Sequence, residues 1–124
     1  MRILLLADTH LGFDYPLRPR VQRRRRGPDF FDSYLRVLDF AARTKPDLVV
    51  HGGDFFFRSR VAQKIVEMAY EPLFNLARSG TPIVIVPGNH ERSRLPSSLW
   101  LASPNIHVFD KPRTFSIQAS GHTI

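Results

Sequence analysis

Three short stretches of the chain are almost continuously apolar, a pattern typical of strands buried on both faces of a parallel sheet. They cover residues 2–7, 47–50 and 82–86, and the third is rich in β-branched side chains. We predict a strand at each stretch and expect the first strand to be fully buried.

The segments between these strands carry apolar side chains at helical spacing. The first predicted helix begins at Pro28 or Asp29, because proline suits a first turn and an acid suits the positive end of the helix dipole. It ends at Lys45-Pro46, and one apolar face should point into the core. That face consists of Phe31, Tyr34, Leu35, Leu38 and Ala42.

The second predicted helix extends from about Ser59, a favourable N-cap, to about Arg78. Pro72 should kink or split this helix, and Gly80 should end it. The order strand, helix, strand, helix, strand predicts an α/β fold in which right-handed crossovers build a parallel sheet.

The C-terminal third of the chain is less regular. We expect a short helical turn over residues 97–102, strands over 106–109 and 114–118, and the start of another strand at 123–124. No repeat or linker divides the chain, so we predict that residues 1–124 have no internal domain boundary.

Metal-binding side chains follow each of the three predicted strands. The segments are Asp8-Thr9-His10, Gly52-Gly53-Asp54 and Gly88-Asn89-His90-Glu91. The carboxyl ends of parallel strands lie at one edge of the sheet, where open α/β folds bind their ligands. Asp8 and His10 are two residues apart, so an extended strand end would point both to the same side. Carboxylate, imidazole and amide oxygen together suit divalent ions such as Mn²⁺, Fe²⁺ or Zn²⁺.

A pair of such ions can assist the hydrolysis of a phosphate ester. Asp54 has two carboxylate oxygens with which to bridge two ions, and Asn89 offers a neutral oxygen. Two ions roughly 3.5–4 Å apart can clamp an in-line phosphoryl displacement. The sequence therefore predicts metal-assisted hydrolysis as the reaction class.

The positive charge of the chain is concentrated in one loop, predicted over residues 11–28. The chain has 18 basic and 11 acidic residues, and its net charge of +7 favours polyanionic partners. Clustered arginine side chains can bind the phosphates of DNA in a salt-dependent way. Self-association of the chain and plain solvation of the loop are the alternatives. We expect Asp14, in the same loop, to be solvated. The candidate DNA-binding residues are Arg18, Arg20, Arg23, Arg24, Arg25 and Arg26.

The sequence contains no cysteine and no long apolar segment. Without cysteine there is no disulfide framework, and the cytoplasm is the expected location. No apolar run approaches the roughly 20 residues of a membrane helix, and the N-terminal run is too short for a signal peptide. We therefore expect no membrane association.

The three motifs, in this order, resemble the first three motifs of the calcineurin-like metallophosphoesterases. The finer resemblance is to the nuclease subunit of the SbcCD-type DNA double-strand-break repair exonucleases. It rests on residues 7–12, on the basic segment before Asp29-Phe30-Phe31, and on residues 86–92. The resemblance implies a layered metallophosphoesterase-type sheet with flanking helices, of which this chain would be the N-terminal β-α-β-α-β half.

The resemblance also implies a role for each motif residue. Asp8 and His10 would bind the first of two divalent ions. Asp54 would bridge both ions, and Asn89 would bind the second. His90 would contact the scissile phosphate as the catalytic histidine. The ions would be Mn²⁺, the substrate would be DNA, and the partner would be an SbcC-type ATPase subunit.

The match to this family stops early. Family members supply further histidine ligands from later motifs, whereas this chain stops at Ile124, and His122 comes too early to take their place. We therefore expect the chain alone to bind metal weakly and to hydrolyse little or nothing. We also expect a homo-oligomer, because a sheet cut at one edge leaves a strand and apolar surface uncovered.

Other residues near the motifs are interpreted as structural. We expect His51 and His107 to pack in the core and Glu91 to brace the third motif. The default for Phe55-Phe56-Phe57 is also core packing, although partial exposure would suit base stacking or a partner surface. Two other functions stay open. One is a small-molecule phosphoesterase of the same fold, which would need no basic track, and the other is a non-catalytic scaffold with part of the metal site.

Overall fold

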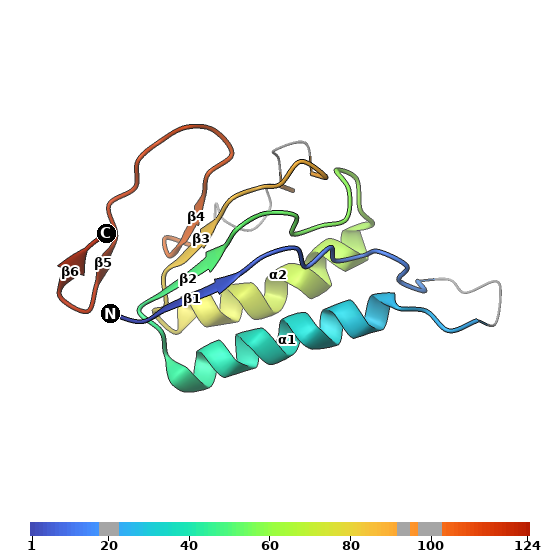
Figure 1. The fold of residues 1–124 in the computed structure, drawn as a ribbon, viewed down its shortest axis with the longest axis horizontal. Coiled ribbons are helices and arrows are strands. Elements are labelled where there is room, and N and C mark those ends of the chain that lie inside the picture. The colour runs from blue at the N-terminus through green and yellow to red at the C-terminus, as the bar shows by residue number, and fades with distance from the viewer. Residues whose placement is uncertain (18–22, 92–94, 97–102) are drawn as a thin grey trace.

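A computed structural model describes residues 1–17, 23–91, 95–96 and 103–124. Two long helices lie beside a four-stranded sheet, and a small hairpin lies near the N-terminus (Figure 1). In chain order the elements are β1 (Ile3–Leu6), α1 (Gly27–Thr44), β2 (Leu48–His51), α2 (Gln63–Arg78), β3 (Ile83–Ile85), β4 (Ile106–Val108), β5 (Gln118–Ala119) and β6 (His122–Thr123).

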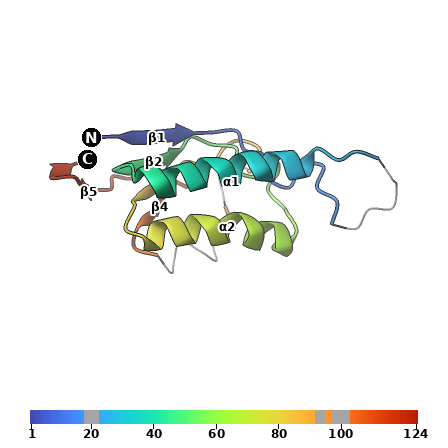
Figure 2. The same cartoon turned by 90° about the horizontal axis from the view of Figure 1, so that it is seen from below.

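The main sheet is entirely parallel, with the strand order β1-β2-β3-β4. Leu6 pairs with His51, and His51 pairs with Ile85, so the carboxyl ends of β1, β2 and β3 lie level. This arrangement confirms the predicted α/β fold and brings the three motif segments to one edge. Successive strands add in one direction, and crossovers of one hand then put their helices on the same face. Figure 2 shows α1 and α2 together on that face.

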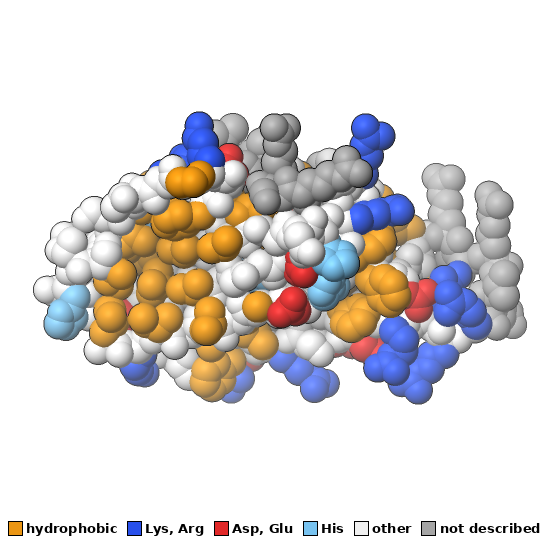
Figure 3. All heavy atoms as spheres, turned by 45° about the horizontal axis from the view of Figure 1, so that its top comes forward, with side chains coloured by type: hydrophobic (Ala, Val, Ile, Leu, Met, Phe, Trp, Pro, Cys, Tyr) orange, Lys and Arg blue, Asp and Glu red, His pale blue; other side chains and the backbone are white. Residues whose placement is uncertain are grey.

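The opposite face of the sheet is open, and the prediction of a fully buried first strand is wrong. Ile3 is 50% exposed and Leu5 is 70% exposed, whereas Leu4 and Leu6 pack against the core. Side chains alternate between the two faces of a strand, and the helices cover only one of them. Figure 3 shows an apolar expanse on this side of the molecule, which we call the open sheet face. By register it includes Ile3, Leu5, Val50 and Val84.

Helix α1 begins and ends close to the predicted residues. It starts at Gly27 with Pro28 in the first turn, and Lys45 caps its end in a left-handed conformation. Its predicted core face is partly wrong, because Leu35 and Ala42 are exposed and Ala41 is buried instead. The buried stripe is narrow since α1 meets the sheet and α2 on one side only.

Helix α2 begins later than predicted. It starts at Gln63 and its N-cap is Ala62, so the predicted cap at Ser59 is wrong. Ala62 has ψ of 143°, an extended conformation, so the chain enters the helix only at the next residue. Pro72 lies inside α2 without splitting it, and Gly80, with φ of 99°, follows its end as predicted. The Tyr34 hydroxyl of α1 donates to the Ala69 carbonyl of α2 over 2.7 Å, which ties the two helices together.

The C-terminal segment differs from the prediction after β4. A strand over 114–118 is wrong, since β5 and β6 instead form a two-stranded antiparallel hairpin around Gly121. The ring of Phe115 packs against the rings of His107 and Phe109, with centroids 4.8 and 4.9 Å away, and β5 begins only at Gln118. The helical turn predicted over 97–102 lies outside the described residues. Within the described part of the chain, no helix is both long enough and apolar enough to cross a membrane.

Candidate metal centre

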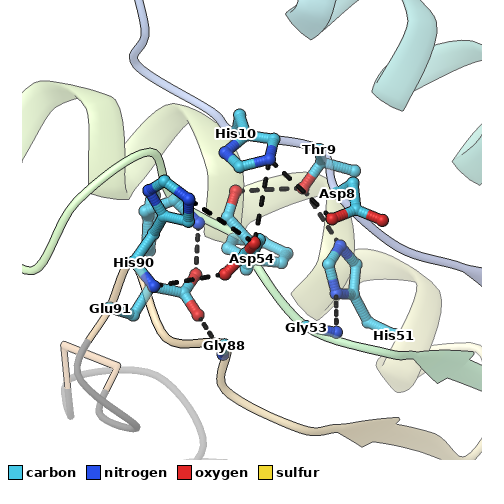
Figure 4. A network of polar contacts seen from close by, with 11 residues as sticks. Asp8, Thr9, His10, His51, Gly53, Asp54, Gly88, His90 and Glu91 are labelled. Atoms are coloured by element: carbon cyan, nitrogen blue, oxygen red, sulfur yellow. Dashed lines mark hydrogen bonds and ion pairs between the residues drawn. The ribbon is translucent and has the colours of Figure 1, made fainter.

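Backbone hydrogen bonds continue beyond the ends of β1 and β2 and hold the first two motifs side by side. The amide of Asp8 donates to the Gly53 carbonyl over 2.9 Å, and the amide of His10 donates to the Asp54 carbonyl over 3.0 Å. The next amide, that of Leu11, donates to the Phe55 carbonyl over 2.9 Å. The two segments therefore form one rigid support for the side chains drawn in Figure 4.

Three of the motif residues have left-handed backbone conformations. The φ angles of Asp8, His10 and Asp54 are 55°, 43° and 50°. The predicted reason for the convergence of Asp8 and His10, an extended strand end, is therefore wrong. Their side chains still meet, since His10 Nε2 lies 3.8 Å from Asp8 Oδ1. Clustered strain of this kind is typical of functional sites rather than of ordinary loops.

Two imidazoles face one carboxylate at the centre of the cluster. Asp54 Oδ2 lies 3.9 Å from His10 Nε2 and 3.9 Å from His90 Nε2. The two imidazole rings meet edge to face, with centroids 5.0 Å apart. Potential ligand atoms of these three residues all lie within 4.8 Å of one another (Figure 4). Imidazole and carboxylate groups are suitable ligands for Mn²⁺, Fe²⁺ or Zn²⁺, so the side chains in this cluster fit the class of divalent ion that the motifs predict.

The third motif approaches Asp54 so closely that only glycine fits at position 88. A β-carbon on Gly88 would overlap the Asp54 carboxylate and its backbone amide. In the same loop the amide of His90 donates to Asp54 Oδ1 over 3.3 Å. Asn89 lies between these two residues with an exposed side chain. The structure thus brings Asp8, His10, Asp54 and His90 together, while the side chain of Asn89 is exposed.

Glu91 joins the third motif to the second, as predicted. Its side chain is 1% exposed, and its two carboxylate oxygens accept hydrogen bonds from the amides of Phe56 and Gly88. Burial raises the pKa of this carboxyl group, while the backbone donors at Gly88 and Phe56 act in the opposite direction. A buried acid with both oxygens on backbone amides of two loops acts as a brace for those loops.

His51 and Thr9 make a second connection between motifs. The Thr9 hydroxyl donates to the Phe55 carbonyl over 2.9 Å, so the nearby Nε2 of His51, 3.0 Å away, acts as donor to it. The Nδ1 of His51 then accepts from the Gly53 amide over 3.3 Å. Burial lowers the pKa of His51 to about 4, which favours this neutral form. Both ring nitrogens are used, which confirms the structural interpretation of His51.

Asp14 binds arginines of the basic loop predicted over residues 11–28, which we call the arginine loop, and the expectation that Asp14 is solvated is wrong. It accepts hydrogen bonds from the Arg26 amide and from the side chains of Arg25 and Arg23 at 2.8–2.9 Å. The Arg26 amide, followed by the Arg25 and Arg23 guanidinium groups, lowers the pKa of Asp14 to about 2. A lone acid just ahead of an arginine run was the sequence signal for this contact.

The other predicted loop residues have different surroundings. Arg26 pairs with Asp29 at 2.8 Å, and Arg24 is exposed. Arg18 and Arg20 lie outside the described residues. His122 lies in the β5–β6 hairpin, whose Ser120 hydroxyl binds Asp47 ahead of β2, at the edge of the sheet opposite the metal centre. The structure therefore keeps His122 away from the cluster, as its early position in the sequence suggested.

These features define an α/β protein with a cluster of imidazole and carboxylate groups, a candidate metal centre, at the carboxyl edge of a parallel sheet. The chain belongs to the calcineurin-like phosphoesterases, whose family model matches residues 1–122. Membership confirms the resemblance found in the motifs and makes the protein one of a family of hydrolases that use divalent metals.

Curated relatives carry the name DNA double-strand break repair protein Mre11. The protein from Methanococcus maripaludis is 32% identical over 73% of this chain, which corresponds to 23% of the relative. Those from Haloferax volcanii and Methanosarcina mazei are 33% and 34% identical over 81% and 82% of this chain. The matched parts are 21% and 15% of those two relatives, so the chain spans about a quarter or less of the length of each.

Proposed function

We propose that this chain carries part of the metal centre of a nuclease that hydrolyses phosphodiester bonds in DNA. The observation that supports this most strongly is the convergence of His10, Asp54 and His90, with ligand atoms within 4.8 Å of one another. The Mre11 relatives are named for the repair of DNA double-strand breaks, which favours DNA as the substrate. The net charge of +7 favours a polyanion over a small phosphate ester.

Each motif residue has a place in this proposal. Divalent ions, Mn²⁺ by resemblance, would supply Lewis acidity and neutralise charge at the phosphate when bound. Asp8 and His10 would hold one ion. Asp54 would bridge two ions, and Asn89 would hold the second.

His90 is proposed as the catalytic histidine. Its side chain is 52% exposed at the rim, and its amide is tied to Asp54, so its ring is both accessible and positioned. There it would hold a proton on Nε2 toward a phosphate oxygen or the leaving group.

The arginine loop is proposed to bind the DNA backbone, and an SbcC-type ATPase is proposed as the partner of the complete protein. Arg23 and Arg25 are held by Asp14 in fixed positions rather than left free, which lowers the entropy lost on contact with a phosphate. Arg24 is exposed beside them. The ATPase partner rests on the resemblance to the SbcCD-type nucleases alone.

A calorimetric titration with Mn²⁺ tests the metal centre. The variant is Asp54→Asn, which removes the charge but tolerates the left-handed backbone, and the control is Asp39→Asn on α1. We expect the unmodified chain to bind Mn²⁺ weakly, Asp54→Asn to bind at least about tenfold more weakly, and Asp39→Asn to match the unmodified chain. Failure of the unmodified chain to bind any Mn²⁺ would overturn the proposal.

The same samples, assayed on linear DNA, test the substrate and the completeness of the site. We expect little cleavage by the isolated chain, because the family draws further histidines from later motifs. Tight binding of two ions with cleavage that Asp54→Asn abolishes would show that this chain alone completes the site. DNA affinity should fall steeply between about 50 and 200 mM salt, because contacts between arginines and phosphates weaken as salt rises. A small-molecule esterase needs no basic track and would show no such salt-dependent binding of DNA.

A further inference from the structure

Phe13 is a large aromatic side chain left half exposed beside the metal centre. It is 50% exposed, although the neighbouring Phe55 and Phe56 are fully buried. Its ring rests against Phe30 and Phe57, with centroid distances of 5.9 and 6.2 Å. We call the three rings of Phe13, Phe30 and Phe57 the aromatic platform. An apolar side chain held in place with one side in water can pack against a ligand.

Two of the three rings of the aromatic platform, Phe13 and Phe57, lie on the same two segments as the metal centre, and Phe30 comes from α1. The amide of Phe13 donates to the His10 carbonyl over 3.2 Å, closing a four-residue turn with Gly12 at its third position and φ of 92°. Such a turn keeps its first and last Cα atoms within about 7 Å of each other. In the other segment the amide of Phe57 donates to the Leu11 carbonyl over 3.3 Å. Figure 3 shows apolar side chains directly beside the histidine and acidic side chains of the site.

The charges around the aromatic platform indicate what it binds. The guanidinium of Arg58 lies 4.7 Å from the centre of the Phe57 ring. Asp14, the residue after Phe13, forms ion pairs with Arg23 and Arg25 at 2.8 and 2.9 Å. The open sheet face, by contrast, is apolar over neighbouring strands and suits another protein surface. Exposed aromatic rings can stack on a flat, electron-rich group of a ligand, and nearby arginines can bind its anionic backbone.

We propose that Phe13, supported by Phe30 and Phe57, stacks on an unpaired nucleobase of the DNA strand whose phosphodiester lies at the metal centre. This inference rests on the proposed function and adds a substrate preference to it. A base can reach Phe13 only when it has left its own stack, so the platform favours single-stranded or frayed ends over blunt duplex ends.

A binding experiment on single-stranded oligonucleotides tests the platform. The variant is Phe13→Leu, which keeps apolar bulk but removes the aromatic ring. The matched control is Phe40→Leu on α1, because Phe40 is 49% exposed and lies outside the two site segments. Binding is measured by fluorescence anisotropy with EDTA present, for a normal oligonucleotide and for one with abasic positions.

We expect Phe13→Leu to weaken binding of the normal oligonucleotide by roughly 5- to 150-fold, the range for loss of one base–aromatic stack. Phe40→Leu should bind like the unmodified chain. The abasic oligonucleotide should bind Phe13→Leu and the unmodified chain equally, since it has no base to stack. Phe13→Trp should restore binding of the normal oligonucleotide, which a loss caused only by misfolding would not allow.

The outcomes separate this inference from the proposed function. If the chain binds DNA in a salt-dependent way and binds Mn²⁺, and Phe13→Leu changes neither, the stacking role of the aromatic platform is overturned. The nuclease proposal would then still stand. Equal losses for normal and abasic oligonucleotides would also overturn the platform. Absence of DNA binding and of Mn²⁺ binding by the unmodified chain would overturn both.

Discussion

The backbone at the metal centre is held in conformations that most side chains avoid. Asp8, His10 and Asp54 all have φ between 43° and 55°. Asp and Asn reach this region at modest cost through local hydrogen bonds, whereas other non-glycine residues pay about 1–2 kcal/mol. Aspartate at positions 8 and 54 therefore suits both the backbone conformation and the binding of a metal, and substitutions can separate the two contributions.

The variants Asp8→Asn and Asp8→Ala separate them. We expect Asp8→Asn to change the free energy of unfolding by less than about 0.5 kcal/mol, and Asp8→Ala to lower it by about 1 kcal/mol, because alanine tolerates the left-handed region poorly. Both should weaken Mn²⁺ binding, since both remove the carboxylate. Urea unfolding in EDTA and calorimetry measure the two effects. Equal stability of both variants would contradict a backbone role for Asp8.

His51 makes stability depend on pH. Its pKa is about 4 in the folded chain against 6.5 for an ordinary histidine, so between these values the unfolded chain binds a proton that the folded chain does not. Stability from this residue is therefore present above pH 6.5 and is lost as the pH falls toward 4. We expect His51→Gln to flatten the loss, which is roughly 3 kcal/mol at most. Urea unfolding from pH 7.5 to 4.5 measures it, with the exposed His122→Gln as control. A slope unchanged by His51→Gln would contradict the argument.

The loops at the carboxyl edge work as a unit because side chains tie them to one another. Glu91 links the third loop to the second, and His51 with Thr9 links the second to the first. Gly88 allows the third loop to touch Asp54. The strands supply the general position of each motif, while these contacts set the spacing of the ligand atoms.

The variant Glu91→Gln tests the tie between the loops. The amide group of glutamine cannot accept from both backbone donors, so one of them, at Phe56 or Gly88, would be left buried without a partner. We expect a loss of about 1–3 kcal/mol in the free energy of unfolding and weaker Mn²⁺ binding. The matched control is Glu67→Gln, an exposed acid on α2, which should stay within about 0.5 kcal/mol. Unchanged Mn²⁺ affinity in Glu91→Gln would show that the tie does not position the ligands.

The main sheet is covered on one face only. Both helices cover one face of the sheet, and the open sheet face presents apolar side chains from neighbouring strands (Figures 2 and 3). Burial of such a face is favourable at roughly 25 cal/mol per Å² of apolar area removed from water. β1 also has only one strand neighbour in the described sheet, so its other edge is available for pairing. Both features support the expected self-association.

The variant Leu5→Lys tests this expectation. Leu5 is 70% exposed on the open sheet face, so a lysine fits without disturbing the core. We expect light scattering to show a dimer or larger assembly of the unmodified chain at high concentration, and a shift toward monomer in Leu5→Lys. Leu35→Lys on α1, which is also partly exposed but lies on a helix, is the control. If the unmodified chain is monomeric at high concentration, the prediction of self-association is wrong.

The sequence by itself determined the order of the elements and the meeting of the motifs. Continuous apolar runs and helical spacing are local patterns, and a β-α-β-α-β order leads to parallel strands whose carboxyl ends share one edge. The positions of Asp8, His10, Asp54 and His90 at that edge follow from this order without any knowledge of tertiary contacts. Asp and Gly at the motif positions also agree with the backbone conformations that the structure has there.

Only the tertiary structure decided which faces are covered and which side chains connect the loops. The sequence predicted a buried β1 because an apolar run does not show whether a second layer covers the sheet. Leu35 and Ala42 are exposed and Ala41 is buried because the packing of α1 against its neighbours decides which side of the helix faces the core. Thr9 and His51 are 42 residues apart, and Phe56 and Glu91 are 35 apart, so their contacts depend on strand register and turn geometry. The same holds for Phe13, whose exposure beside the metal centre depends on a turn that brings it back to His10. Local patterns fix what each segment can form, whereas burial and long-range hydrogen bonds depend on which segments come to lie next to it.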